Sequence, residues 1–258
     1  MSELLRIENL SIDIKGQDEK RSLVSNLSLD VNALETVALV GGSGGGKTTI
    51  GLAILQLLSP AMQITSGKIF FDGKDLLECR EKQMQKMRGK KIAMVFQEPL
   101  SAFNPVFRIG NQIAEVLQFH TRLNQRQIRE KVFELLDLVE VPDPKRVASY
   151  YPHQLSGGLR QRAMIAQAIA GNPELIIADE PTSNLDVTIQ ARILSLFKKI
   201  KNELNISMLL ITHDLGVVRF LAERVFVLDQ GCIIESGCVS DVFDCPQQDF
   251  TKKLMELA

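Results

Sequence analysis

Hydrophobic and polar residues alternate along the first 32 positions of the chain. Apolar residues recur at mostly every second position in two runs: Leu5, Ile7, Leu10, Ile12 and Ile14, and then Val24, Leu27, Leu29 and Val31. A period of two puts one face of a strand against a core, so these runs predict two half-buried antiparallel strands. Further on, "GKIFFDGKDL" combines an apolar run with Asp72-Gly73, a pair typical of a tight hairpin turn.

The pattern becomes helical between residues 101 and 170. One predicted helix begins near Asn124, which with Gln127 resembles a capping box. Its apolar residues fall on one face: Ile128, Val132, Leu135, Leu136 and Val139.

Buried strands return from Leu175 onward. "LIIADE" and "SMLLIT" are separated by the helical pattern "TIQARILSLFKKIKNEL", and "RVFVLDQGCIIESG" predicts a closing hairpin. Strands that alternate with helices indicate an α/β fold. We therefore expect a single domain over residues 1–258. Its α/β core comprises residues 1–100 and 171–258, with an antiparallel N-terminal β-subdomain and an inserted helical subdomain at 101–170.

Composition excludes little and adds few candidates. The 258 residues are 45% hydrophobic and 24% charged with a net charge of −1, so no nucleic-acid partner is expected. No apolar run approaches the roughly 20 residues of a membrane span, and "MSELLRIENL" lacks the features of a signal peptide. The four cysteines show no metal-ligand spacing, which favours reduced thiols.

The stretch "VALVGGSGGGKTT" is a complete Walker A pattern between a predicted strand and a predicted helix. Glycines let successive backbone N–H groups turn toward phosphate oxygens, and the helix N-terminus adds a favourable partial charge. Lys47 would neutralise the β- and γ-phosphates, and the Thr48 hydroxyl would ligate Mg²⁺. A chance glycine turn is the alternative, and the apolar flanks argue against it. The expected nucleotide-binding residues of this loop are Gly41, Gly42, Ser43, Gly44, Gly45, Gly46, Lys47, Thr48 and Thr49.

Two carboxylates end the apolar strand in "LIIADEP". Asp179 suits Mg²⁺, directly or through water, because ligands bind at the carboxyl ends of strands in open α/β sheets. Glu180 is placed to orient and deprotonate an attacking water. Alone, such a pair would be read as exposed turn residues, but a Walker A pattern upstream favours catalysis.

"YPHQLSGGLRQR" contains a second candidate anion site. Ser156, Gly157 and Gly158 open a predicted helix at 159–170, although a plain helix N-cap is the alternative for the isolated tetrapeptide. One nucleotide does not need two such sites from one chain. The segment resembles the LSGGQ signature of ABC-type ATPases, with Leu159 in place of the usual glutamine. That family's signature grips the γ-phosphate of ATP bound to the opposite subunit.

Three further segments match the same family in its usual order. Gln97 matches the Q-loop, which contacts Mg²⁺ and the transmembrane partner; residues 183–186 match the D-loop at the dimer interface; His213 matches the switch histidine. The resemblance implies a RecA-like P-loop NTPase core that binds ATP and Mg²⁺ and hydrolyses ATP. The implied catalytic residues are Glu180, His213 and Gln97, and the implied metal ligands are Thr48, Gln97 and Asp179.

A narrower resemblance is to the ATPase subunits of dipeptide, oligopeptide and nickel importers. "VFQEPLSAFNPVFRIGNQIAEVL" carries it, and the chain stops at "CPQQDFTKKLMELA", as in short, nickel-type members. This implies a second ATPase subunit (identical or a sister chain), two transmembrane permease subunits and, indirectly, an extracytoplasmic solute-binding protein. The location implied is the cytoplasmic face of the inner membrane, and the implied cargo is nickel or di- and oligopeptides.

Two positions depart from the family pattern. The family usually stacks adenine on an aromatic residue near the second strand, yet no Phe, Tyr, Trp or His precedes Phe70, and Ile14 is the expected replacement. Leu34 stands where the family usually has glycine.

Three other functions fit this sequence less well than an importer subunit. A non-transport ABC ATPase would carry long coiled-coil insertions, zinc motifs or tandem cassettes, and this sequence shows none of them. A P-loop kinase would lack the signature helix that this sequence predicts after Ser156. A nucleotide-binding partner with weak hydrolysis is disfavoured because Ser156, Glu180 and His213 are all present.

Overall fold

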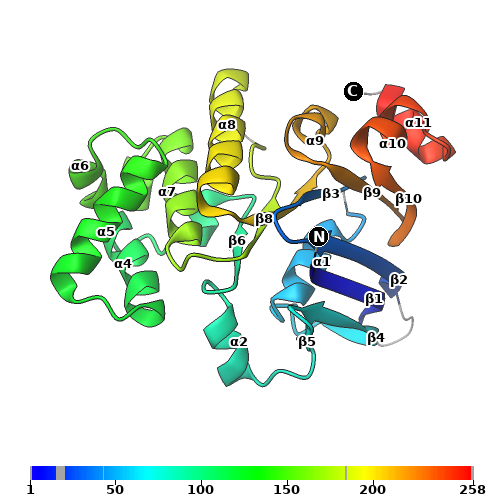
Figure 1. Cartoon of the computed structure of the whole chain (residues 1–258), viewed down its shortest axis with the longest axis horizontal. Coiled ribbons are helices and arrows are strands. Elements are labelled where there is room, and N and C mark those ends of the chain that lie inside the picture. Colours follow the sequence, from blue (N-terminus) through cyan, green and yellow to red (C-terminus); the bar gives the residue numbers. More distant parts are fainter. Residues whose placement is uncertain (1, 16–20, 43, 184, 257–258) are drawn as a thin grey trace. The chain divides into compact units, whose positions relative to one another are not determined.

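The computed structural model describes residues 2–15, 21–42, 44–183 and 185–256 of the chain. These residues form two compact units, which are described separately. Unit 1 comprises Met1–Gln85 and Ile206–Ala258, and unit 2 comprises Lys86–Asn205. Figure 1 shows the elements of both units, coloured along the sequence.

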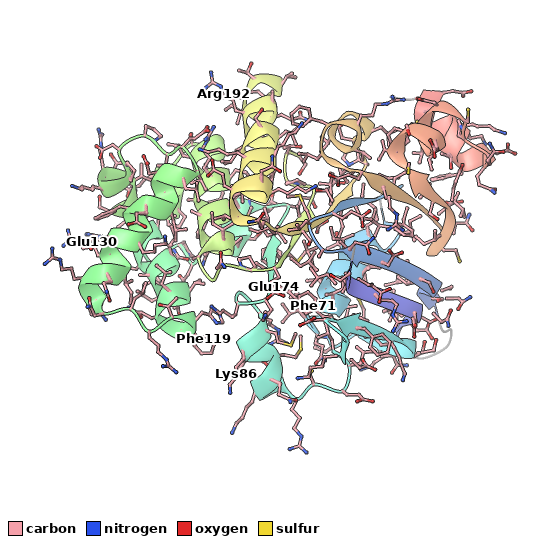
Figure 2. The ribbon with its side chains drawn as sticks, viewed as in Figure 1. Phe71, Lys86, Phe119, Glu130, Glu174 and Arg192 are labelled. Carbon is pink, nitrogen blue, oxygen red and sulfur yellow. The ribbon has the colours of Figure 1, made fainter. Side chains whose placement is uncertain are left out.

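The first sheet of unit 1 is antiparallel and confirms the strands expected from the N-terminal alternation. Its strand order is β2-β1-β4-β5. The strands are β1 Glu3–Ile14, β2 Arg21–Asn32, β4 Met62–Phe71 and β5 Lys74–Asp75. The predicted hairpin turn is also present, because Asp72 and Gly73 join β4 to β5 with φ angles of 48° and 73°. Phe71, at the end of β4, is buried in the core of this unit (Figure 2).

A bulge explains why the N-terminal alternation skips one position between Ile7 and Leu10. Asn9 has a φ of 49°, and the pairing of β1 with β2 shifts register there. Its N–H donates to Ser28 Oγ at 2.9 Å. The extra residue reverses which face each later side chain occupies, so both Ile7 and Leu10 are buried.

The other strands of unit 1 pair with β3 Thr36–Gly41 or with its neighbours. β3 pairs in parallel with β8 Ser207–Thr212 on one side and β9 Arg224–Asp229 on the other, and β9 pairs with β10 Cys232–Cys238 in the predicted closing hairpin. β3 and β8 are buried along their whole length, as expected for parallel strands. The helices of this unit are α1 Lys47–Ile54, α9 Leu215–Leu221, α10 Val239–Asp244 and α11 Asp249–Glu256, and α2 Glu81–Met87 lies across the sequence boundary at Gln85.

Unit 2 contains a parallel strand pair and the predicted helices. The strands are β6 Ile92–Val95 and β7 Leu175–Asp179. The helices are α3 Pro99–Ala102, α4 Ile109–His120, α5 Gln125–Leu138, α6 Pro144–Ala148, the 3₁₀ turn η1 Pro152–Gln154, α7 Gly157–Ile169 and α8 Val187–Leu204. The capping box at α5 is confirmed, since Asn124 and Gln127 exchange hydrogen bonds of 2.9 and 3.0 Å. Figure 2 shows Phe119 of α4 on the surface, where it is 63% exposed.

Cysteines and helix lengths add two observations. Cys79 is buried, whereas Cys232, Cys238 and Cys245 are exposed, and all four thiols are free. Within the residues that the structure describes, no helix is both long enough and apolar enough to cross a membrane.

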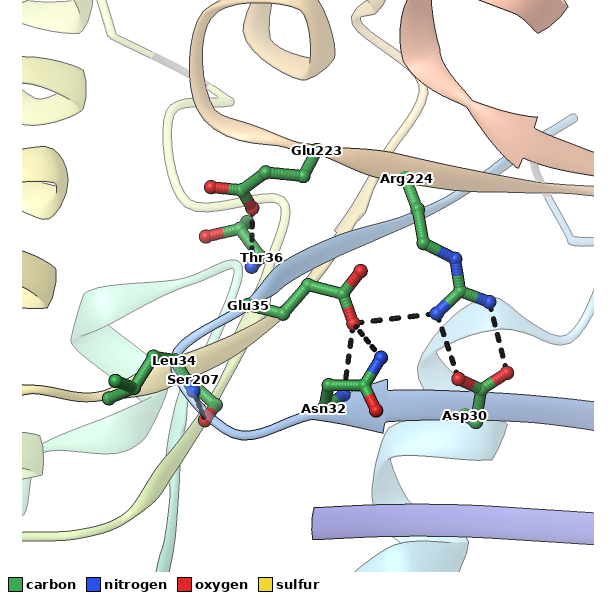
Figure 3. Close-up of polar contacts among 8 residues, drawn as sticks. All are labelled: Asp30, Asn32, Leu34, Glu35, Thr36, Ser207, Glu223 and Arg224. Carbon is green, nitrogen blue, oxygen red and sulfur yellow. Dashed lines mark hydrogen bonds and ion pairs between the residues drawn. The ribbon is translucent and has the colours of Figure 1, made fainter. Parts of the chain in front are cut away.

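Leu34 adopts a conformation that explains why glycine would suit its position. Its φ is 65°, in the left-handed region, and its side chain is 55% exposed. Its N–H donates to Ser207 Oγ at 2.8 Å, which fixes the turn between β2 and β3 (Figure 3). A left-handed residue with a Cβ costs roughly 1–2 kcal/mol relative to glycine.

We predict that Leu34→Gly raises the free energy of unfolding by about 0.5–1 kcal/mol. Relief of the left-handed strain outweighs the extra chain entropy that glycine gives the unfolded state. Chemical denaturation of both proteins measures the difference. Leu34→Ala is the matched control, because it removes the side chain but keeps the strained Cβ. A Gly variant no more stable than the Ala variant would contradict the prediction.

Candidate active site

The glycine loop in unit 1 lies between a buried strand and a helix, as the Walker A pattern predicts. β3 ends at Gly41 and α1 begins at Lys47. A Cβ on Gly41 would overlap the carbonyl oxygen of Leu228 in β9, so another residue type does not fit there. Gly46, the N-cap of α1, has a φ of 95°, and a Cβ there would lie 3.0 Å from the Leu23 carbonyl oxygen. The loop therefore folds against the backbones of two other strands.

The side chain of Lys47 lies over this loop. Its Nζ donates to the carbonyl oxygens of Gly41 and Gly42 at 2.8 and 2.9 Å, and the residue is only 7% exposed. A buried ammonium beside a turn of backbone amides is the arrangement that binds phosphate. The other predicted loop residues lie as follows: Gly42, Gly44 and Thr48 are exposed, Gly45 and Thr49 are half-buried, and Ser43 falls outside the described residues.

His213 lies near the glycine loop within the same unit. It directly follows β8, whose last residue Thr212 pairs with Val40 of β3, one residue before Gly41. The two strand ends are neighbours, so the start of the glycine loop and His213 share one edge of the sheet. His213 is exposed there. Asp214, the next residue, caps α9 by accepting from Val217 N–H at 3.1 Å. His213 is therefore held between the end of β8 and the start of α9.

The carboxylates and the glutamine lie together in unit 2. Val95 of β6 pairs with Ala178 of β7, so Gln97 and Asp179 follow two neighbouring parallel strands at the same edge. Asp179 is 2% exposed and Gln97 is exposed. Glu180 has a left-handed φ of 46°, which turns the chain immediately after the strand, and its carbonyl accepts from Ser183 Oγ at 3.0 Å.

The signature segment forms the N-terminus of α7. Ser156 is its N-cap and accepts from Leu159 N–H at 3.4 Å, so the helix begins at Gly157 rather than at residue 159. Gly158 packs against α8, because a Cβ there would lie 3.0 Å from Ile189 Cγ2. Ser156 and Gly157 are exposed, which leaves the helix N-terminus open to a ligand.

Sequence patterns did not identify Gln161, which joins this helix to the carboxylate segment. It lies in the second turn of α7, is 2% exposed, and its Nε2 donates to the carbonyl of Pro181 at 2.7 Å. Pro181 directly follows Glu180. Its burial is visible only in the structure, because in the sequence it is one of several polar residues among the apolar positions of this helix.

The segment matched to the D-loop follows these residues. Asp186 caps α8 by accepting from Ile189 N–H at 3.0 Å, and Asn184 lies outside the described residues. The candidate residues thus divide between the units. Lys47, Thr48 and His213 belong to unit 1, and Gln97, Ser156, Asp179 and Glu180 belong to unit 2.

Comparisons with known proteins agree with this arrangement. Residues 24–183 match the family model described as ABC transporter. The chain is 42% identical to the oligopeptide transport ATP-binding protein of Bacillus subtilis, over 99% of this chain and 72% of that one. It is 43% identical to the dipeptide transport ATP-binding protein of the same organism, over 99% and 76%.

A solved structure shares the fold. It is a dimeric ATP-binding cassette in a post-hydrolysis state, bound to ADP and phosphate. The TM-score is 0.82 at 30% identity, over 92% of this chain and 99% of that one. Together with the P-loop arrangement of β3, the glycine loop and α1, these matches show that the chain belongs to the ABC transporter family, as an ATP-binding subunit that hydrolyses ATP.

Proposed function

We propose that this chain powers a peptide importer by hydrolysing ATP in a head-to-tail ATPase dimer at the cytoplasmic face of the membrane. The observation that carries this proposal is the position of Lys47, whose buried ammonium lies on the carbonyls of Gly41 and Gly42. The loop's amides and this ammonium would bind the β- and γ-phosphates of ATP.

A magnesium ion fits the donor set. Mg²⁺ prefers hard oxygen ligands, and the candidates supply a hydroxyl from Thr48, an amide oxygen from Gln97 and a carboxylate from Asp179. Asp179 is buried at the end of β7, the end of a parallel strand at which ligands bind in open α/β sheets. When bound, the ion would neutralise charge on the phosphates.

Glu180 is the proposed general base. A carboxylate can accept a proton from water as the water attacks the γ-phosphate. Asp179 ends β7, whereas Glu180 has a left-handed backbone that turns the chain after the strand, and we propose separate roles for the two neighbours. His213 would contact the γ-phosphate from the end of β8.

Ser156 is proposed to act on ATP held by a second ATPase subunit. The exposed N-terminus of α7 and its N-cap hydroxyl offer hydrogen bonds and a partial positive charge to an anion. Support comes from the structurally similar cassette, which is described as dimeric. The second subunit would be an identical or a sister chain.

Two transmembrane permease subunits and, indirectly, an extracytoplasmic solute-binding protein complete the proposed importer. The relatives reported above are named for oligopeptide and dipeptide transport, so peptides are the proposed cargo. Nickel, expected alongside peptides from the sequence, stays a prediction.

Replacing the proposed base should separate hydrolysis from binding. Glu180→Gln keeps the size and hydrogen-bonding capacity of the side chain but cannot accept the proton, so ATP turnover should fall about 10²–10⁴-fold. ATP binding should persist, because the glycine loop is unchanged. Phosphate release and equilibrium ATP binding measure the two effects. Glu130→Gln, the same change at an exposed site on α5, is the control. Near-parental turnover in Glu180→Gln would assign the base elsewhere, with His213 next.

A charge at the signature helix should block hydrolysis without blocking binding to isolated subunits. Ser156→Arg fills the N-terminus of α7, so the assembled ATPase should lose turnover while the monomer binds ATP nearly as the parent does. Lys47→Ala should instead abolish binding by the monomer. Ser195→Arg, at an exposed position of α8, controls for the added bulk and charge. Equal losses of monomer binding in Ser156→Arg and Lys47→Ala would contradict action across the dimer.

The cargo is tested in the assembled importer. The chain, purified in complex with its permease subunits and reconstituted in vesicles with the solute-binding protein, should drive ATP-dependent uptake of labelled di- and oligopeptides. The same assembly with Glu180→Gln should not. Uptake of nickel without uptake of any peptide would overturn the peptide assignment.

A further inference from the structure

Arg224, the first residue of β9, holds two carboxylates from other elements of unit 1. Its NH1 and NH2 donate to the two oxygens of Asp30 in β2 at 2.8 and 3.0 Å, and NH1 also lies 3.4 Å from Glu35 Oε2. Figure 3 shows the planar guanidinium facing Asp30 edge-on, with Glu35 beside it. Such a two-point pair fixes orientation as well as charge. We call Asp30, Glu35 and Arg224 the Arg224 clasp.

Glu35 extends the clasp into the turn before β3. Its Oε2 accepts from both the backbone N–H and the side-chain Nδ2 of Asn32, each at 2.9 Å, and the residue is 8% exposed. The hydrogen bonds that Arg224 donates to Asp30 raise the pKa of Arg224 more than burial lowers it. Loss of the arginine would therefore leave a buried carboxylate without its cation, which is costlier than the loss of a surface pair.

The strands β3 and β9, which meet at the Arg224 clasp, contact the glycine loop at their opposite ends. β3 and β9 run in parallel, with Val37 paired to Arg224 at the clasp and Gly41 paired to Leu228 at the loop. At the loop, the Leu228 carbonyl leaves no room for a Cβ on Gly41. The clasp and the floor of the loop thus lie at opposite ends of one strand pair.

β2 also extends from the Arg224 clasp to the glycine loop. Asp30 lies toward one end of β2, and Leu23 lies seven residues earlier, about 23 Å away at the rise of an extended strand. The Leu23 carbonyl packs against both Gly46 of the loop and Gly231 of the β9–β10 turn. Ser25 N–H donates to the Gly231 carbonyl at 2.9 Å, which links β2 to that turn. A displacement of β2 along β9 would move the Leu23 carbonyl against the loop.

We propose that Arg224 is a positioning residue for nucleotide binding: by holding β2 and β3 against β9, the Arg224 clasp keeps the Leu23 and Leu228 carbonyls where the glycine loop can accept phosphates. This inference rests on the proposed phosphate-binding role of that loop. Arg224 itself touches neither the loop nor the nucleotide. Its removal should therefore weaken ATP binding and leave the chemical step unchanged.

The test compares Arg224→Gln with Arg219→Gln in the full chain. Arg219 of α9 forms an exposed ion pair with Asp244 at 3.4 Å in the same unit, so it controls for the loss of a cation. Arg224→Gln should raise the dissociation constant of a fluorescent ATP analogue, and the KM for ATP, about 5–20-fold, with kcat within about twofold of the parent. Arg219→Gln should match the parent. Arg224→Lys, which keeps the charge but not the two-point contact, should lie between them.

Two results would overturn the inference. One is an Arg224→Gln protein that melts earlier yet, while folded, binds the analogue with the parental dissociation constant, because the clasp would then serve stability alone. The other is a fall in kcat at unchanged KM. Should Arg224→Gln fail to fold, Asp30→Asn removes one charge at nearly constant shape and is read by the same criteria. Lys47→Ala separates the two proposals: if it binds the analogue as the parent does, the proposed phosphate role of the loop is wrong, whatever Arg224→Gln shows.

Discussion

The proposed nucleotide site depends on a close approach between two backbones, that of Gly41 and that of Leu228. The carbonyl of Leu228 occupies the volume that a side chain at Gly41 would need. This contact is possible because β3 and β9 are adjacent parallel strands in fixed register, and it sets where the chain leaves β3 to form the loop. The ammonium of Lys47 then lies on the carbonyls of the first two loop residues. Packing against β9 therefore fixes the conformation of the loop, and phosphate binding is not needed to form it.

The polar network at the opposite end of β3 follows from the same geometry. Strands from two sheets meet there, and the partly buried carboxylates of Asp30 and Glu35 need a cation. Thr36 N–H donates to Glu223 Oε2 at 2.6 Å and Leu34 N–H donates to Ser207 Oγ, whereas the N–H groups of Ala33 and Glu35 donate to backbone carbonyls (Figure 3). A turn held in this way can carry a left-handed leucine, because the surrounding hydrogen bonds outweigh the local strain.

Local patterns predicted the parts of this fold that depend on neighbours in sequence. The strand, glycine loop and helix around Lys47, the Asp72-Gly73 turn and the capping box at Asn124 each follow from residues within a few positions of one another. The Arg224 clasp could not be predicted in this way, because Arg224 and Asp30 are 194 positions apart and carry no periodicity. The bulge at Asn9 was visible only as a skipped position. Gln161 looked like any polar helix residue until its burial and its bond to Pro181 were known.

Gln161 also bears on how hydrolysis and subunit contact are related. The segment that carries Asp179 and Glu180 is hydrogen-bonded to the signature helix through Gln161 and Pro181, and Gly158 packs that helix closely on α8. Within unit 2, a displacement of the Ser156 end of α7 therefore acts on the backbone immediately after Glu180. Glu180 has a left-handed backbone, a strained conformation for a residue other than glycine that persists only while the surrounding structure holds it. If Ser156 engages the phosphate of a second subunit, that contact and the alignment of this subunit's own base become mechanically linked. Such a link would make hydrolysis sensitive to dimer closure without any additional residue.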